Sequence, residues 1–114
     1  MNDFFKILES KTADGCHEFI VDINKEHKVF EGHFPGNPVV PGVMSMMMIR
    51  KCAETIIGRK TRFATISQCK YHNVIIPDGR KKTIKVSVDE ALTLKGEIND
   101  ETGAALLTIK GTLV

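Results

Sequence analysis

Apolar and polar residues alternate in the stretch "CHEFIVDIN" near the start of the chain. Phe19, Val21 and Ile23 share one parity, while Glu18 and Asp22 lie on the other. A period of two residues is typical of a β-strand with one buried and one solvated face. The pattern therefore predicts a strand here, with the three apolar side chains facing a core.

The pattern of apolar and polar residues changes to that of a helix at about Val43. We expect this helix to run to about Ile57. Proline is well tolerated in a first helical turn, which fits Pro41, and Gly58 is a common type of helix end. A helix that is apolar on all sides is normally buried on all sides. The first two turns meet that condition with six residues: Val43, Met44, Met46, Met47, Met48 and Ile49. We therefore expect a buried central helix and treat the methionines as core residues.

The remaining segments predict further strands and one short helical piece. Residues 3–8 are expected to form one or two helical turns, with Phe4, Phe5 and Leu8 on one side. Four stretches after the helix have strand character and turn signals between them: "FATISQCKYHNVII", "TIKVSVDE", "LTLKGEI" and "AALLTIKGTLV". A strand, a buried helix and four antiparallel strands predict an α+β fold in which one curved antiparallel sheet is wrapped around a central helix.

Composition narrows the classes of protein that fit. The 114 residues are expected to form a single domain, 1–114, and the 16 basic and 14 acidic residues nearly balance, which does not favour a nucleic-acid partner. No stretch has the length and character expected of a signal peptide or a membrane span. Three widely spaced cysteines fit no zinc or disulfide pattern. We expect a cytoplasmic protein with reduced thiols and no metal or cofactor.

The most specific motif is "GHFPGNPVVPGV", residues 32–43. It resembles the signature of the bacterial β-hydroxyacyl-acyl carrier protein dehydratases, in which a His-Phe-Pro loop precedes a Pro-Gly pair at the start of a long central helix. The later segment "CKYHNVIIPD" is similar to the third-strand region of that family, and the resemblance covers nearly the whole chain. It implies the hot-dog fold and, in the fatty-acid or polyketide type of acyl metabolism, a 3-hydroxyacyl thioester as substrate.

The resemblance also implies roles for particular residues. His33 would be the base that removes the C2 proton, since neutral histidine has a suitable pKa. The backbone N–H groups of Gly42 and Val43 would polarise the thioester carbonyl, because a helix start carries unpaired N–H groups and a partial positive charge. Phe34 and Met44 would line the acyl site. His17, His27 and His72 lie in no such motif and are expected to be surface or strand histidines.

This chain departs from the family at the second catalytic group. The family places a Glu or Asp on the central helix fourteen residues after the histidine, and that acid protonates the departing hydroxyl. The position is Met47 here, and a thioether has no proton to donate. The next helix carboxylate, Glu54, lies seven residues further on, roughly 10 Å at 1.5 Å per residue. Glu31 lies just before the histidine and could orient it, although a solvated loop carboxylate is its more usual role, and Asp22 is a similarly weak candidate.

Three readings follow from the missing acid. In the family, the histidine and the acid of one site come from different subunits, so a mixed dimer with an acid-bearing related chain would restore a complete site. A homodimer would instead retain a weak or different reaction on acyl thioesters, such as hydrolysis. The third reading is a non-catalytic module that binds an acyl chain or an acyl carrier protein. Each reading expects a dimer, because pairing would close an open strand edge.

The carrier of the acyl group is the remaining question. Both an acyl carrier protein and coenzyme A fit the resemblance. Acyl carrier proteins are acidic, and positive charge near the site would steer them. Three groups of basic residues are candidates for such a docking patch: Arg50 and Lys51; Arg59, Lys60 and Arg62; and Arg80, Lys81 and Lys82.

Overall fold

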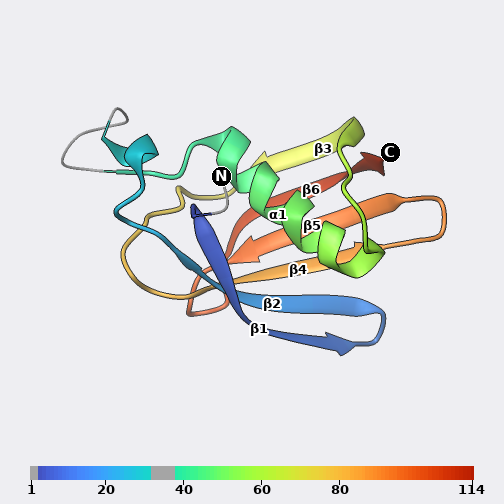
Figure 1. Ribbon diagram of the computed structural model, residues 1–114, viewed down its shortest axis with the longest axis horizontal. Helices are drawn as coiled ribbons and strands as arrows, with labels where there is room; N and C mark the ends of the chain where they lie inside the picture. Colours follow the sequence, from blue (N-terminus) through green and yellow to red (C-terminus); the bar gives the residue numbers. More distant parts are fainter. Residues whose placement is uncertain (1–2, 32–37) are drawn as a thin grey trace.

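The computed structural model describes residues 3–31 and 38–114, which form one antiparallel sheet and one long helix (Figure 1). Six strands make up the sheet: β1 (Phe5–Ala13), β2 (Cys16–Ile23), β3 (Phe63–Tyr71), β4 (Lys82–Val88), β5 (Thr93–Asn99) and β6 (Ala105–Leu113). Their order across the sheet is β1-β2-β4-β5-β6-β3. The helix α1 (Gly42–Ile57) and the short 3-10 helix η1 (Lys28–Phe30) lie between β2 and β3 in the chain.

The helix α1 lies along one face of the curved sheet and packs against β4 and β5 (Figure 1). Helix and sheet lie close together at Gly96 of β5, where a Cβ atom would lie 2.8 Å from Cγ2 of Ile49. A larger residue at position 96 would push the helix away from the sheet. The side chains between sheet and helix are fully buried, among them Met48, Ile49, Ile84, Val86, Leu94, Ile98 and Leu107. The predicted α+β arrangement of sheet and central helix is thereby confirmed.

The alternation in β2 is confirmed as well. Phe19, Val21 and Ile23 are 4%, 0% and 4% exposed, while Asp22 and the other residues of opposite parity are only partly buried. The bounds expected for α1 differ from the observed ones by a single residue. Gly58 ends the helix with a left-handed φ of 85°, and its N–H donates to the Glu54 carbonyl at 2.8 Å.

The expected helical turns at residues 3–8 are wrong, because Phe5 begins the edge strand β1 and pairs with Ile23 of β2. The reason lies at the sheet edge, where most β1 side chains are exposed and need no alternation of apolar and polar residues. Phe4, just before the strand, is fully buried. Its ring lies 5.3 Å from the ring of His27 and 5.8 Å from that of Phe30.

The expectation that α1 is buried on all sides is also wrong within a single chain. Met44, Met48 and Ile49 are buried, but Val43 is 68% exposed and Met46 and Met47 are only partly covered. The helix covers one face of the sheet and turns its other face outward (Figure 1). An apolar helix surface is therefore available for further contact.

The two outer strands of the sheet are β1 and β3. β3 is exposed along almost its whole length, and two large side chains on it, Ile66 and Tyr71, are 44% and 54% exposed.

Over the described ranges, no helix is long and apolar enough to cross a membrane.

Candidate active site

The start of α1 carries no side-chain cap. Pro41 occupies the N-cap position in an extended conformation, and it makes no side-chain hydrogen bond to the helix. The N–H groups of Met44 and Ser45 both donate to the Pro41 carbonyl, at 3.0 and 3.1 Å. Gly42 and Val43 precede these residues, so their N–H groups have no acceptor within the helix. Over residues 3–31 and 38–114, neither group has an acceptor outside the helix either, and both lie at the positive end of the helix dipole.

A hollow of about 570 Å³ lies beside this helix start. It is bounded by the chain that leads into α1 and by the end of β3 with the loop after it, through Val39, Val40, Gly42 and residues 71–75. The Val40 N–H donates to the Ile75 carbonyl at 2.8 Å and ties the two segments together. Most of the lining is apolar, as expected for a site that takes part of an acyl group.

Tyr71 brings a hydroxyl group to the helix start. A Cβ atom at Gly42 would lie 2.6 Å from Oη and 3.2 Å from Cζ of Tyr71, so only glycine permits this approach. Beneath it, the buried Ser45 hydroxyl donates to the Gly42 carbonyl at 2.6 Å. Partial burial raises the pKa of the Tyr71 phenol, the neighbouring Ser45 hydroxyl opposes this rise, and Cys69 adds to it. The phenol is therefore protonated at neutral pH.

The sequence-predicted site residues separate into three groups. His33 and Phe34 lie outside the described residues, so their predicted roles stay predictions. Gly42 lines the hollow, whereas the Val43 side chain is exposed and only its backbone N–H shares the helix start. Met44 is 6% exposed within the core and is not part of the hollow's lining.

Met47 is partly buried against the core, one turn and a half beyond Gly42.

Glu54 cannot replace the acid that Met47 lacks, because its carboxylate is engaged near the other end of the helix. It accepts from Arg50 Nη1 and from the Thr61 N–H, both at 2.9 Å, and lies 3.6 Å from Lys51 Nζ. Asp22 lies on β2 opposite Lys6, and Glu31 follows η1, so neither lines the hollow.

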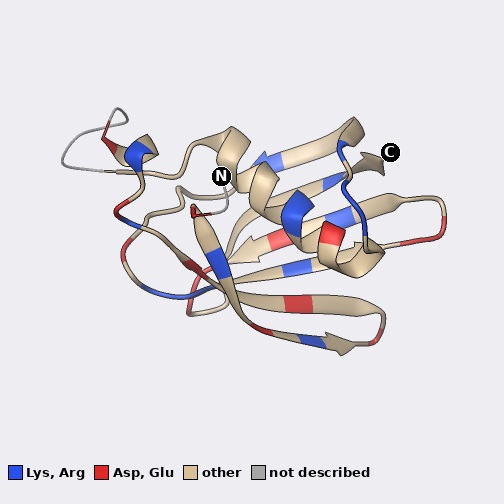
Figure 2. Ribbon diagram, in the orientation of Figure 1, with Lys and Arg blue, Asp and Glu red and all other residues tan. Residues whose placement is uncertain are grey.

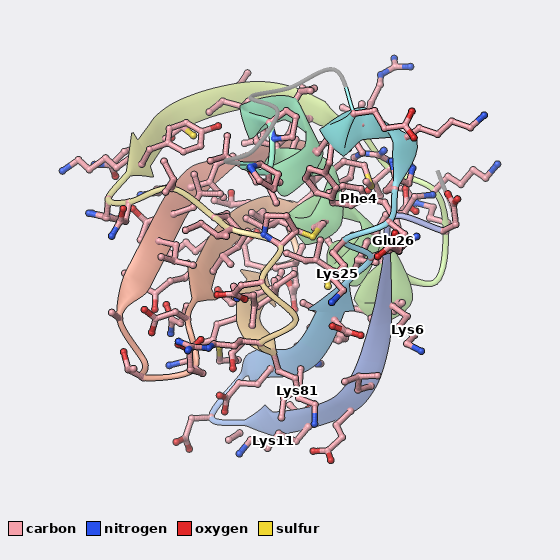
Figure 3. All side chains as sticks on the ribbon, turned by 90° about the vertical axis from the view of Figure 1, so that its left-hand side faces the viewer. Phe4, Lys6, Lys11, Lys25, Glu26 and Lys81 are labelled. Atoms are coloured by element: carbon pink, nitrogen blue, oxygen red, sulfur yellow. The ribbon has the colours of Figure 1, made fainter. Side chains whose placement is uncertain are left out.

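The basic groups occupy different ends of the molecule (Figure 2). Arg59, Lys60 and Arg62 follow the C-terminal end of α1, roughly 24 Å from its start at 1.5 Å per residue. Lys82 is buried and forms a 3.0 Å ion pair with Asp78, which removes it from the third group. Lys81 and Lys25 are exposed at the end of the molecule that faces the viewer in Figure 3, which is the end where α1 begins.

Metal and thiol chemistry find little support in the part of the chain that the structure describes. There, no group of three or more His, Cys, Asp or Glu side chains is placed to hold a metal ion. Cys52 is fully buried, and burial raises the pKa of its thiol to about 12. A thiol with that pKa stays protonated and is a poor nucleophile.

Tyr71 is the residue at this site that the sequence did not reveal. It belongs to the segment "CKYHNVIIPD", which supported the family resemblance, but nothing in the spacing connects it with Gly42, twenty-nine residues earlier. The signal that could have found it is the Pro-Gly pair itself. A glycine at the first turn of a helix indicates that another group approaches the backbone closely.

Comparison with known proteins matches this chain to dehydratases. The sequence profile of the ApeI-like family, described as ApeI dehydratase, matches residues 9–106. A 3-hydroxyacyl-[acyl-carrier-protein] dehydratase FabZ from Latilactobacillus sakei is 34% identical over 98 residues, which cover 80% of this chain and 64% of that protein. The FabZ of Geobacillus thermodenitrificans is 30% identical over 116 residues, covering 96% of this chain and 73% of that protein. The chain thus spans about two thirds of the length of these relatives.

Among solved structures, the dehydratase heterocomplex ApeI:P from Xenorhabdus doucetiae superposes on this chain with a TM-score of 0.80. The match covers 95% of this chain and 96% of that one at 21% identity. It confirms the hot-dog fold, with its curved sheet around one helix. On the family profile, the FabZ relatives and this fold, the chain belongs to the ApeI-like dehydratase family.

Proposed function

We propose that this protein acts on 3-hydroxyacyl thioesters by the chemistry of a dehydratase, a hydro-lyase reaction. The observation that carries the proposal is the uncapped start of α1, with the N–H groups of Gly42 and Val43 beside an apolar hollow. A thioester carbonyl oxygen seated there would accept from both groups. The helix dipole would stabilise the negative charge that develops as the C2 proton leaves.

His33 is proposed as the base for that proton. It stands nine residues before Gly42 in the motif, and the prolines between them restrict the backbone of the connecting loop. A base held in place loses little entropy on reaching the transition state. The expulsion of the C3 hydroxyl then requires a proton donor, and Met47 does not provide one.

A dimer with a related, acid-bearing chain is one source of that donor. The solved ApeI:P complex is a dehydratase heterocomplex, which is a precedent for such pairing in this fold. β3 offers the surface, because it is an outer strand of the sheet and is exposed along its length. The uncovered helix face at Val43 and Met47 would also gain cover. We propose association through the β3 edge, as a homodimer or a mixed dimer.

The carrier of the substrate is proposed to approach the end of the molecule where α1 begins. Lys25 and Lys81 project there and would attract an acidic acyl carrier protein (Figure 3). Arg59, Lys60 and Arg62 lie at the other end of the helix, and the docking role first considered for them is therefore not proposed. A coenzyme A thioester is the alternative carrier.

The proposed function is tested with purified protein and 3-hydroxyacyl thioesters of an acyl carrier protein and of coenzyme A, analysed by mass spectrometry. The chain is assayed alone and mixed with acid-bearing related chains. The expected product is the 2-enoyl thioester, 18 mass units lighter than the substrate because one water is lost. Free 3-hydroxy acid would instead indicate a thioesterase. Binding without any product would indicate a non-catalytic acyl-binding module.

The missing acid gives the same assay a second arm. Met47→Glu restores a carboxylic acid at the family's position and is expected to raise the dehydration rate of the isolated chain, with general acid catalysis worth about 10²- to 10⁴-fold. Met47→Gln is the matched control, since it has similar size and no acidic proton. An equal rise in both variants would contradict the role given to position 47.

A further inference from the structure

Met47 gives this site no proton donor, and the hydroxyl of Tyr71 lies at the same site. It lies over the first residue of α1, so close that a Cβ on Gly42 would come within 2.6 Å of Oη. The side chain lines the same hollow as Gly42. A thioester whose carbonyl oxygen meets the Gly42 and Val43 N–H groups would have its C3 hydroxyl two carbon atoms away, within reach of that phenol.

Other groups around the hollow are poorer donors. Among the lining residues that the structure describes, His72 and Asn73 are the other side chains with polar hydrogens. His72 Nε2 lies 3.2 Å from Oγ1 of Thr108 on β6, and the Asn73 side-chain oxygen accepts from the Val74 N–H. His72 is thus directed to a partner of its own, and the amide hydrogens of Asn73 are too weakly acidic to protonate a leaving hydroxyl. Tyr71 has its hydroxyl at the helix start, beside the first residue of α1.

We propose that Tyr71 is the general acid of this site and protonates the departing C3 hydroxyl in place of the missing helix carboxylate; this inference rests on the proposed function. The base takes the C2 proton, and the C2–H electron pair forms the C2=C3 double bond. The C3–O bond breaks, and its oxygen takes the phenol proton and leaves as water. The phenolate regains a proton from the protonated base through solvent, so the sum is loss of one water.

A phenol is a weaker acid than a carboxylic acid but a competent one. Its proton is present throughout the neutral range, because a phenol ordinarily loses its proton only near pH 10 and partial burial raises the pKa of Tyr71 further. The arrangement would give the isolated chain a slow dehydration of its own. It also gives Gly42 a second role, since any larger residue there would displace the phenol.

The test compares wild type with Tyr71→Phe on the N-acetylcysteamine thioester of 3-hydroxyoctanoic acid. Two rates are measured: formation of the 2-enoyl product and exchange of the C2 hydrogen for deuterium in heavy water. Tyr71→Phe is expected to lower the first rate by about 10²-fold and to leave C2 exchange within about threefold of wild type, since only the acid step is removed. Loss of both rates together would assign Tyr71 to the carbonyl instead and would overturn the proposal.

A double-mutant cycle provides a second, independent readout. With Met47→Glu present, a carboxylic acid performs the proton donation, so adding Tyr71→Phe is expected to cost less than about threefold. Thr12→Val, which removes an exposed hydroxyl on β1, is the control for hydroxyl loss as such. Thermal unfolding of each variant shows whether the fold is retained.

The outcomes separate this inference from the function on which it rests. Normal dehydration by a folded Tyr71→Phe variant overturns the role of Tyr71 and leaves the dehydratase function standing. Wild type that forms no enoyl product, alone or with an acid-bearing partner, overturns the proposed function and this inference with it. A tenfold or larger loss from Tyr71→Phe in the Met47→Glu background would also contradict the role, because the phenol would then act in some other step.

Discussion

The two ends of α1 use their backbone groups in opposite ways. At the C-terminal end, the Gly58 N–H donates to the Glu54 carbonyl, and the Glu54 carboxylate accepts from Arg50 and from the Thr61 N–H. At the N-terminal end, Pro41 provides no side-chain cap, and no carboxylate stands in the first turn. The C-terminal end is closed by a glycine and by a carboxylate that binds the loop after it, whereas the N-terminal end has two N–H groups with no acceptor among the described residues.

This difference separates stability from function within one helix. An N-terminal cap from Ser, Thr, Asp or Asn typically stabilises a helix by about 1 kcal/mol, and this helix does without it. A buried or half-buried helix start without a partner is unusual, and anions and polarised carbonyls are what such starts bind. We infer that the N-terminal end is kept open for the substrate, while the C-terminal end holds the helix in place.

The largest effect is expected at the N-terminal end from His33→Ala. Removal of a general base typically lowers a rate by about 10²- to 10⁴-fold, and we expect a loss of dehydration within that range. Turnover of a 3-hydroxyacyl thioester provides the measurement. His17→Ala, on β2 and paired with Thr12, is the matched histidine control and should retain activity. Equal losses in the two variants would remove the special role of His33.

The same substitution at two glycines sharpens the comparison. Gly42→Ala keeps the backbone N–H but sets a methyl group against the Tyr71 hydroxyl, so we expect dehydration to fall by about 10²-fold, the cost of a displacement of about 1 Å. Gly58→Ala forces alanine into a left-handed conformation and should cost about 1 kcal/mol of unfolding free energy.

The two measurements for these glycine variants are turnover and thermal unfolding. Gly58→Ala should lower the melting temperature by about 4 °C and leave turnover intact. Gly42→Ala should instead lower turnover and leave the melting temperature unchanged. If both variants lose stability and keep activity, the helix start is a structural feature and not a site.

A third change tests the C-terminal end alone. Glu54→Ala removes the acceptor of the Thr61 N–H and the partner of Arg50, and the Glu54 side chain is only 12% exposed. Hydrogen bonds to charged groups contribute about 1.5–3 kcal/mol, so urea unfolding should show a loss of about 2 kcal/mol. The dehydration rate of the folded variant should be unchanged, because Glu54 lies far from the start of α1. A dehydration rate that falls in Glu54→Ala would contradict this and make Glu54 a candidate for the catalytic acid.

The smallest effect concerns the carrier. Lys25→Glu combined with Lys81→Glu should weaken binding of an acylated carrier protein by a few fold at low salt, since each exposed charge contributes well under about 1 kcal/mol. Arg59→Glu with Lys60→Glu, at the other end of the helix, serves as the control. Affinity is measured by titration at two salt concentrations. A larger loss in the control pair would place the docking surface at the C-terminal end.

The sequence predicted those parts of the fold that depend on residues close together in the chain. It missed those parts that depend on contacts between distant segments. The alternation of Phe19, Val21 and Ile23 and the bounds of α1 follow from local patterns, because a buried face dictates which positions are apolar. β1 was missed because an outer strand with exposed side chains imposes no such pattern. The exposure of Val43 was missed because the sequence shows that the residue is apolar but not which other part of the protein, if any, covers it.

The site divides in the same way. The motif from His33 to Val43 is contiguous, so the sequence alone predicts that the proposed base and the helix start belong to one site. Tyr71 reaches Gly42 only because β3 runs back to the start of α1 after the helix has ended. A contact across the fold of this kind is decided by how strands pair, and single-sequence patterns do not contain it.

The central claim is that the start of α1 is the thioester site, and backbone amide NMR tests it most directly. The ¹⁵N-labelled protein is titrated with the amide analogue of a 3-hydroxyacyl pantetheine thioester, which cannot be hydrolysed. We expect the largest amide shifts at Gly42 and Val43, with Tyr71 also affected and Gly58 and Arg59 unchanged. Shifts concentrated at Gly58 and Arg59, or saturation of binding with Gly42 and Val43 unmoved, would contradict it.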